Sequence, residues 1–272
     1  MERIFSMPDL YDPGLSGKSV LVTGGGTGIG RAAALALGKL GARVAVVTGH
    51  SASAGEETAA LIRQAGGEAF SLTCDITDED QVIRMVAAVA ERYGRLDCAF
   101  NNAGLGPDGV RIPYGHLVEL DLDTWEKIMA VNLRGTFLCL KHELLQMERQ
   151  GGGGSIVNNA SIGGLKMSPG YGAYGPSKAG VVALTRLAAL EHAHSGIRVN
   201  AVCPGPTEGT PLMENTLRTD PGKEARLEGE IIPLGRLGTA GDVAEAVVWL
   251  CSPLSRHTTG QALSVDGGLH IK

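Results

Sequence analysis

KSVLVTGGGTGIG, residues 18–30, joins an apolar run to a glycine-rich turn at which a helical pattern begins. Glycine lets the backbone turn tightly and lets a pyrophosphate approach the amide groups at a helix start. Because the chain has 40 glycines, a merely flexible loop is the alternative interpretation. The position of the turn directly after the first apolar run favours phosphate binding. The residues expected to bind there are Gly24, Thr27, Gly28, Ile29 and Gly30.

Short apolar runs alternate with amphipathic segments along the rest of the chain. Strands are predicted at 18–23, 43–48, 68–73, 96–101, 154–159, 197–203 and 261–265. Helices are predicted at 28–40, 54–65, 78–93, 124–149, 173–194 and 239–251. This alternation is typical of βαβ units on a parallel sheet, so the expected fold class is α/β.

Local signals mark several ends of these elements. The acidic run at 77–80 resembles a helix N-terminus, and Thr239 with Asp242 approximates a capping box. Gly41, Gly66-Gly67 and Gly94 each follow a helical pattern and precede a strand. A left-handed residue is expected at these helix ends.

The length of 272 residues fits one larger α/β domain. We expect an N-terminal extension at 1–16 and a catalytic domain at 17–272, with 151–154 as a mobile loop inside it. Residues 204–235 form the only long irregular stretch, which is typical of a substrate loop.

Composition excludes several classes of function. A net charge of -5, with two Trp and four Phe, argues against nucleic-acid binding. No apolar run approaches the ~18 residues of a membrane span, and the first residues do not resemble a signal peptide. Five scattered cysteines without a CxxC pair are expected to be reduced and buried, as in a cytoplasmic protein. His192 and His194 lack metal-pair spacing, so no metal is expected, and the run 141–143 is expected to be an exposed or interface face.

The end of the second predicted strand bears on cofactor choice. In a dinucleotide fold an acidic side chain here accepts the ribose 2′-hydroxyl and repels a 2′-phosphate. Gly49, His50 and Ser51 follow Thr48, and none of them is acidic. The residues therefore weakly favour NADP(H), with NAD(H) as the open alternative.

Two further strand ends carry small polar residues. Asp75 and Ile76 follow the third strand, where they would contact an adenine ring or form a helix cap. Asn102, Ala103 and Gly104 follow the fourth strand, where they would close around a cofactor or simply form a turn.

Ser161, Tyr174 and Lys178 form the strongest candidate catalytic set. Positions i and i+4 share a helix face, so the Lys178 ammonium is expected beside the Tyr174 phenol. A nearby cation lowers the pKa of a phenol, which makes Tyr174 a candidate general acid/base. Pro176 fits only if the helix begins near Tyr174.

These motifs together resemble the short-chain dehydrogenase/reductase family over residues 17–268. The resemblance is carried by TGGGTGIG (23–30), NNAG (101–104), Asn132 in AVNLRG, Ser161, the run YGPSK (174–178), and Pro204-Gly205. Each motif alone is modest, whereas their order and spacing are very specific.

The resemblance implies a single Rossmann-type domain with a seven-stranded parallel sheet and helices on both faces. It implies a catalytic tetrad of Asn132, Ser161, Tyr174 and Lys178, in which Asn132 supports a water of the proton relay. Tyr174 and Lys178 would also contact the cofactor. Pro204 and Gly205 would do so too, with Thr210 or Thr207 on the nicotinamide carboxamide, because this loop has one residue more than the family pattern.

The expected function is interconversion of a secondary alcohol and a ketone with NAD(P)(H). A lyase or epimerase on the same scaffold, or a silent dinucleotide sensor, are the alternatives. Few charges occur in 105–117, 163–171 and 206–232, so a moderately apolar small molecule fits better than a phosphorylated sugar. The apolar surplus of 179–190 and 124–147 predicts a homo-oligomer, a tetramer by resemblance.

Overall fold

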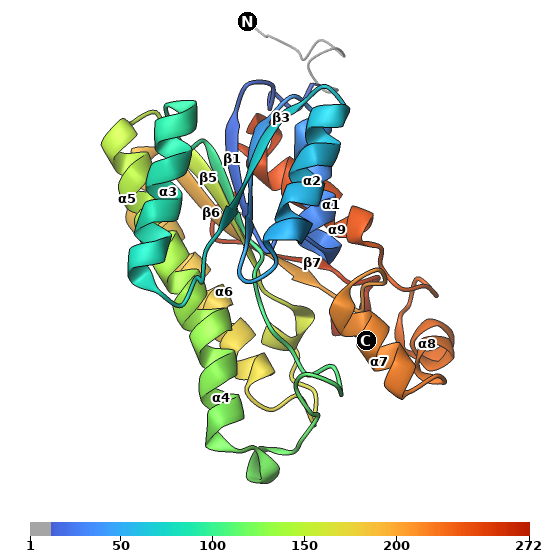
Figure 1. Cartoon of the computed structure of the whole chain (residues 1–272). Coiled ribbons are helices and arrows are strands. Elements are labelled where there is room, and N and C mark those ends of the chain that lie inside the picture. The colour runs from blue at the N-terminus through green and yellow to red at the C-terminus, as the bar shows by residue number, and fades with distance from the viewer. Residues whose placement is uncertain (1–11) are drawn as a thin grey trace, which may run out of the picture.

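Seven parallel strands form one sheet in the computed structural model, which describes residues 12–272 (Figure 1). The strands are β1 (Ser19–Thr23), β2 (Arg43–Thr48), β3 (Glu68–Thr73), β4 (Cys98–Asn101), β5 (Gly154–Asn159), β6 (Ile197–Pro204) and β7 (Ala262–Val265). Their order is β3-β2-β1-β4-β5-β6-β7, so the chain changes direction between β1 and β4. In open α/β sheets ligands bind beyond the carboxyl ends of the strands at such a point. The α/β class and the seven strands are confirmed.

Helices cover both faces of the sheet (Figure 1). They are α1 (Gly28–Lys39), α2 (Ala52–Gln64), α3 (Glu79–Tyr93), α4 (Leu122–Met129), α5 (Thr136–Gln150), α6 (Tyr174–His192), α7 (Pro211–Thr219), α8 (Lys223–Arg226) and α9 (Ala240–Cys251). Side chains alternate between the faces of a strand. Val20 and Val22 accordingly pack with α1, α2 and α9, whereas Leu21 packs with α3, α5 and α6.

The predicted helix ends are present. Asp78 caps α3, and Thr239 with Asp242 forms the capping box of α9. Helix α6 begins at Tyr174 and keeps Pro176 in its first turn. Gly41, Gly66 and Gly94 all have positive φ. These short-range signals therefore set the boundaries as expected.

Two predicted segments differ in the structure. The helix expected at 124–149 is interrupted by a π-helical segment, η3 (Ala130–Gly135), between α4 and α5. The irregular stretch expected at 204–235 contains α7, α8 and a second π-helical segment, η6 (Leu227–Ile231). Buried Met213 and Leu227 form a small local core with Leu237, just beyond this stretch, and α7 packs on it through Met213 and Leu217.

The predicted exposed face at 141–143 is wrong for one residue. Lys141 and His142 bind Glu79 of α3 on the outside of the fold. Glu143, in contrast, is completely buried, and its Oε2 accepts a hydrogen bond of 2.8 Å from Asn101 Nδ2. Since α5 packs on the sheet, this helix position points inward.

The remaining fold predictions concern the chain ends and cysteines. Residues 1–11 of the predicted extension lie outside the described residues, and Leu15 within it is buried against the core. All five cysteines are free and buried. Among the described residues no helix is long and apolar enough to cross a membrane.

Candidate active site

The glycine-rich turn lies between β1 and α1 and is packed without spare room. A Cβ at Gly30 would lie 2.2 Å from Gly24 O and 2.4 Å from Asn102 Nδ2. Asn102 Nδ2 in turn donates to the carbonyl oxygens of Thr23 and Gly24, at 3.1 Å each. The Asn102 side chain therefore fastens the end of β4 to the turn.

The first turn of α1 is left uncapped. Thr27 is the N-cap residue, yet its side chain makes no capping hydrogen bond, whereas Ser51, Asp78, Thr210 and Thr239 all cap their helices. Unsatisfied N–H groups at a helix start carry partial positive charge and bind anions. This end of α1 fits a phosphate group.

The turn after β2 lies beside the glycine-rich turn, since a Cβ at Gly26 would lie 2.9 Å from Thr48 Cγ2 and 3.0 Å from Ala54 Cβ. Gly49 and His50 are exposed, and Ser51 caps α2 by accepting from Ala54 N. Thr48 donates its hydroxyl proton to the carbonyl of Ser51 at 3.0 Å, so donation from Thr48 to a 2′-phosphate would require this bond to break. The start of α2 lies at the same turn, which adds the positive end of a helix dipole.

Asp75 takes part in a local turn before α3. Its Oδ1 accepts from the backbone and hydroxyl of Thr77, while its own N–H donates to Gln81 Oε1. Asp78, not Asp75, caps the helix. Ile76 is buried and packs against Gly135. A Cβ at Gly135 would lie only 2.7 Å from Ile76 Cδ1.

A cavity of about 320 Å³ opens at the carboxyl ends of β1, β4, β5 and β6. It brings together most of the residues predicted from the sequence. They are Gly24, Thr27, Gly28, Ile29, Asn102, Ala103, Gly104, Ser161, Tyr174, Lys178, Pro204, Gly205, Thr207 and Thr210. The predicted residues outside its lining are Gly30, Gly49, His50, Ser51, Asp75, Ile76 and Asn132.

Tyr174 lies at the start of α6 with its ring in this cavity. Burial raises the pKa of Tyr174 above its usual value, and a hydrogen bond with Ser161 opposes that rise. The pKa lowering expected from Lys178 is therefore not found, because burial of the phenol has the largest effect and the lysine makes no resolved contribution. Ser161 itself is fixed by accepting a 3.0 Å hydrogen bond from Gly163 N.

Lys178 lies one turn further along α6, as predicted. Its Nζ is 5.8 Å from the centre of the Tyr174 ring and donates to the Asn159 carbonyl at 2.7 Å. Burial lowers the pKa of Lys178 to about 8. At neutral pH the lysine is thus mostly a cation held between Tyr174 and the end of β5.

Asn132 is completely buried within the π-helical segment. Its Oδ1 accepts from Leu105 N at 2.7 Å, and its Nδ2 donates to Leu105 O at 2.8 Å and to Ser177 Oγ at 3.1 Å. The amide thereby ties the loop after β4 to α6. A Cβ at Gly104 would lie 3.2 Å from Asn132 Oδ1 and 3.3 Å from Lys178 Nζ, so Asn132 is close to the lysine behind the cavity wall.

The two candidate threonines both line the cavity and both donate their hydroxyl protons to the backbone. Thr207 donates to Gly205 O and Thr210 to Thr207 O. The Thr207 oxygen accepts no hydrogen bond within residues 12–272, which suits the N–H₂ group of a carboxamide, whereas the Thr210 oxygen already accepts from Met213 N at 3.3 Å as the cap of α7. Thr210 packs against Gly28: a Cβ at Gly28 would lie 3.3 Å from Thr210 Cγ2.

The structure adds three residues that the sequence did not single out. Asn159 fixes Lys178 through its carbonyl and donates from Nδ2 to Asn102 Oδ1 at 2.9 Å. Tyr171 lines the cavity beside Tyr174, with 6.4 Å between ring centres. Arg111 also lines it. Tyr171 could have been predicted from the sequence, because it lies three residues before Tyr174, whereas no sequence pattern indicated Asn159 or Arg111.

The described residues fit a nicotinamide dinucleotide. The glycine turn leaves no space for a Cβ, the start of α1 is uncapped, and the buried Asn159 Oδ1 has no partner among residues 12–272. Gly24, Thr27, Gly28 and Ile29 would hold the pyrophosphate, and Lys178, Pro204 and Gly205 would lie at the nicotinamide half. No cluster of metal-ligating side chains occurs within the same described range.

Comparisons with known proteins identify relatives over nearly the whole chain. A family model described as enoyl-(acyl carrier protein) reductase matches residues 24–270. The chain is 42% identical to 2,5-dichloro-2,5-cyclohexadiene-1,4-diol dehydrogenase of Sphingobium indicum over 93% of this chain and 97% of the relative. It is 37% identical to levodione reductase of Leifsonia aquatica over 92% of each chain. The crystal structure of a short-chain type dehydrogenase/reductase from Mycobacterium marinum superposes with a TM-score of 0.87, at 35% identity over 97% of this chain and 99% of that one.

Proposed function

The chain belongs to the short-chain dehydrogenase/reductase family and is an NAD(P)-dependent alcohol/ketone oxidoreductase, and from this premise we propose that Tyr174 is its general acid/base. The observation that carries the proposal is the meeting of Ser161, Tyr174 and Lys178 in one cavity at the carboxyl ends of the strands. In the direction of reduction a ketone oxygen would accept a proton from Tyr174.

The environment of Tyr174 supports proton transfer from this atom. Burial keeps the phenol protonated at neutral pH, so it can donate to a carbonyl oxygen. The Ser161 hydroxyl, in the same cavity, would hold that oxygen by a second hydrogen bond. In the direction of oxidation the same phenol would receive the proton of the alcohol.

Lys178 and Asn132 would assist the proton transfer without exchanging the proton themselves. The Lys178 cation stabilises negative charge that develops on the phenol oxygen as the proton leaves. Asn159 O fixes the ammonium, and Asn132 holds Leu105 and Ser177 at the same wall. We assign Lys178 to the nicotinamide ribose as well, as the resemblance implies.

When bound, the nicotinamide dinucleotide supplies or accepts the hydride. We propose a preference for NADP(H), because the turn at 49–51 carries no acidic residue and lies at the start of α2, where a phosphate is favoured. His50 and Ser51 would face the 2′-phosphate. Asp75 and Ile76 would flank the adenine, and either Thr207 or Thr210 would accept from the carboxamide.

We further propose that residues 204–235 act as the substrate loop of a catalytic domain at 17–272. Leu212 and Met213 of α7 line the cavity, so this helix would exclude water from the reacting atoms. Free cysteines support a cytoplasmic location, and exposed apolar side chains on α5 and α6 support a homotetramer.

A panel of cyclic and acyclic ketones, tested with NADPH and with NADH, examines the proposal. We expect loss of reduced-nicotinamide absorbance with at least one ketone, and a higher kcat/KM with NADPH. A protein that binds the dinucleotide but oxidises it with no ketone would contradict the enzymatic proposal. A tenfold preference for NADH would contradict only the cofactor assignment.

A further inference from the structure

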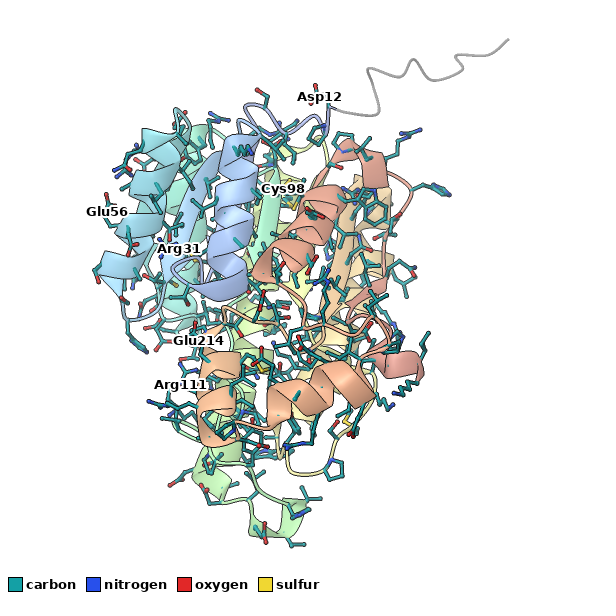
Figure 2. The ribbon with its side chains drawn as sticks, turned by 90° about the vertical axis from the view of Figure 1, so that its right-hand side faces the viewer. Asp12, Arg31, Glu56, Cys98, Arg111 and Glu214 are labelled. Carbon is teal, nitrogen blue, oxygen red and sulfur yellow. The ribbon has the colours of Figure 1, made fainter. Side chains whose placement is uncertain are left out.

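Two charged side chains line the cavity, and the proposed mechanism uses only Lys178. The second is Arg111, in the loop between β4 and α4. Figure 2 shows Arg111 at the level of α7, far from Cys98 in the sheet. A charged group in the substrate part of an otherwise weakly charged cavity requires an explanation.

A buried carboxylate fixes the position of Arg111. Asp108 is completely buried, and its Oδ2 accepts a 2.7 Å hydrogen bond from Arg111 Nε. Its Oδ1 also accepts from the backbone N–H groups of Val110, Arg111 and Ile112. Burial alone would raise the pKa of Asp108, but hydrogen bonds from Asn215, Arg111 and the backbone hold it well below its usual range. Arg111 is thus one of several donors that hold the Asp108 carboxylate in place.

The same carboxylate connects Arg111 to the helix that covers the cavity. Asn215 of α7 donates from Nδ2 to Asp108 Oδ2 at 3.0 Å. A second connection lies nearby, where the Tyr114 hydroxyl and Thr216 Oγ1 are 2.7 Å apart. The guanidinium is therefore set against both the loop after β4 and α7, which together form the substrate side of the cavity.

The far edge of the guanidinium remains available. Within residues 12–272 the side-chain hydrogen bonds of Arg111 involve Nε alone, and the side chain is 52% exposed. The two terminal nitrogens present parallel N–H donors, a geometry that matches the two oxygens of a carboxylate. Leu105, Gly106, Tyr171 and Leu212 of the lining are apolar or aromatic, and the other cation among the lining residues is Lys178, which the proposed mechanism uses.

We propose that Arg111 is an anion-binding residue of the substrate site, and that the substrate is a secondary alcohol or ketone that carries a carboxylate. Asp108 and Asn215 are positioning residues that hold the guanidinium. This inference rests on the alcohol/ketone oxidoreduction proposed above and names the substrate class more narrowly than a moderately apolar molecule.

The test compares 4-oxocyclohexane-1-carboxylate with its methyl ester in the wild-type enzyme and in Arg111→Gln. We expect the wild type to prefer the keto acid. The guanidinium and the substrate carboxylate would form a hydrogen-bonded charge pair, which Arg111→Gln removes. We therefore expect this variant to lower kcat/KM for the keto acid by about 10- to 100-fold, with a much smaller loss for the uncharged ester. Calorimetry gives a second readout that is independent of turnover. The dissociation constant of cyclohexanecarboxylate from the enzyme loaded with oxidised or reduced cofactor should rise by about tenfold or more in the variant.

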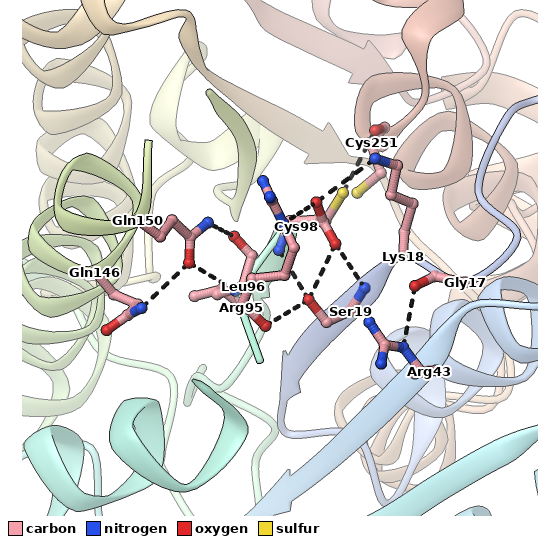
Figure 3. Close-up of polar contacts among 11 residues, drawn as sticks. Gly17, Lys18, Ser19, Arg43, Arg95, Leu96, Cys98, Gln146, Gln150 and Cys251 are labelled. Atoms are coloured by element: carbon pink, nitrogen blue, oxygen red, sulfur yellow. Dashed lines mark hydrogen bonds and ion pairs between the residues drawn. The ribbon is translucent and has the colours of Figure 1, made fainter. Parts of the chain in front are cut away.

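Arg95→Gln is the matched control. Arg95 also donates from Nε to a buried aspartate, Asp97, at 2.8 Å, but at the opposite, amino-terminal edge of the sheet (Figure 3). This variant should keep the acid-to-ester ratio of the wild type. Arg111→Lys retains a cation beside Asp108 and carries the test if Arg111→Gln does not fold, with an expected loss of at least about threefold for the keto acid.

Two outcomes would overturn the assignment of Arg111. One is a wild-type enzyme that binds and reduces the ester as well as the keto acid, and the other is an equal loss for both ketones in Arg111→Gln. Reduction of the ester that disappears in Tyr174→Phe would still support the proposed function. Failure of the carboxylate assignment is therefore distinguishable from failure of the oxidoreductase mechanism.

Discussion

At the scale of single residues, Tyr174 is the group on which the proposed chemistry depends. Replacing it with phenylalanine removes the proton donor and keeps the ring. Because general acid/base catalysis contributes about 10²–10⁴-fold, we expect kcat to fall by that factor while the dissociation constant of the cofactor changes by less than about threefold. Steady-state rates and fluorescence titration with the dinucleotide measure the two effects.

Tyr93→Phe is the control for this substitution. Tyr93 is a buried tyrosine that contacts Val44 O and lies outside the cavity. Its loss should leave kcat nearly unchanged. If Tyr174→Phe retained more than about a tenth of the wild-type kcat, the role of Tyr174 as acid/base would have to be abandoned.

Glu143 is a residue-scale feature with a consequence for stability. It is completely buried, its Oε1 and Asn101 Oδ1 have no partner among residues 12–272, and burial raises its pKa to about 7. The folded protein therefore binds a proton at Glu143 between the ordinary carboxyl pKa and about 7, while the unfolded chain does not. The contribution of Glu143 to the free energy of unfolding falls as pH rises through this window, by about 3 kcal/mol in total.

Glu143→Gln should remove this pH dependence, because the glutamine amide stays neutral. We expect the melting temperature of the variant relative to the wild type to increase by several degrees between pH 5 and about pH 7 and to level off by pH 8. Calorimetric scans across this range measure the difference, with Glu126→Gln, an exposed acid of α4, as the control. A difference that is constant with pH would mean that Glu143 does not exchange a proton in this interval.

At the scale of elements, the turn between β2 and α2 is the place where cofactor choice can be altered. Gly49 does not have a positive φ, and a Cβ there would meet nothing closer than Cys74 O at 3.9 Å. Gly49→Asp is therefore expected to fold normally. Its carboxylate should repel a 2′-phosphate and accept from a 2′-hydroxyl, which moves the ratio of kcat/KM toward NAD(H) by about tenfold or more.

Gly229→Ala serves as the structural control for Gly49→Asp, since its Cβ would meet nothing within 4 Å and it lies in the substrate loop. This variant should keep the cofactor ratio of the wild type. An unchanged ratio in Gly49→Asp would show that the ribose does not lie at this turn.

Elements defined by local pattern were predictable, and elements defined by distant packing were not. The strands lie within two residues of their expected bounds, because each is a short apolar run between turn residues. The π-helical segment at 130–135 leaves no mark in the apolar spacing, and its Asn132 bonds to Leu105, 27 residues earlier in the chain. Helix α7 was missed because its Met213 and Leu217 pack on a small local core, and α8 was missed because it is a four-residue helix with no buried residue.

In the candidate site, too, contacts within one element were predictable from the sequence and contacts between distant segments were not. The Tyr174–Lys178 spacing is local to one helix turn, so the pair could be placed before the fold was known. The bond between Asp108 and Asn215 joins positions 107 residues apart, and no local pattern announces it. Glu143 belongs to a lysine–histidine–glutamate run that is typical of an exposed face, and only the rotation of α5 turns its side chain inward.

At the scale of the whole molecule, α5 and α6 leave an apolar face uncovered. Phe137, Leu145, Leu187 and Leu190 are 44%, 47%, 53% and 81% exposed, and a groove between the two helices is lined by Leu140, Leu144 and Leu184 as well. Lys141, Glu148, Glu191 and His192 rim this groove. An apolar face with a polar rim, presented by two neighbouring helices, suits a two-fold contact with a second copy of the chain.

We expect the wild-type protein to be a tetramer in solution, built from this two-fold contact and a second one. Leu187→Glu places a charge in the middle of the α5–α6 face and should halve the mass measured by light scattering, because burying an unpaired carboxylate costs more than the contact supplies. Leu117→Glu, at a leucine that is 74% exposed and outside the groove, should leave the mass unchanged. A wild-type monomer at concentrations where the enzyme turns over would contradict the tetramer, since the exposed leucines of both helices would then face water in the active form.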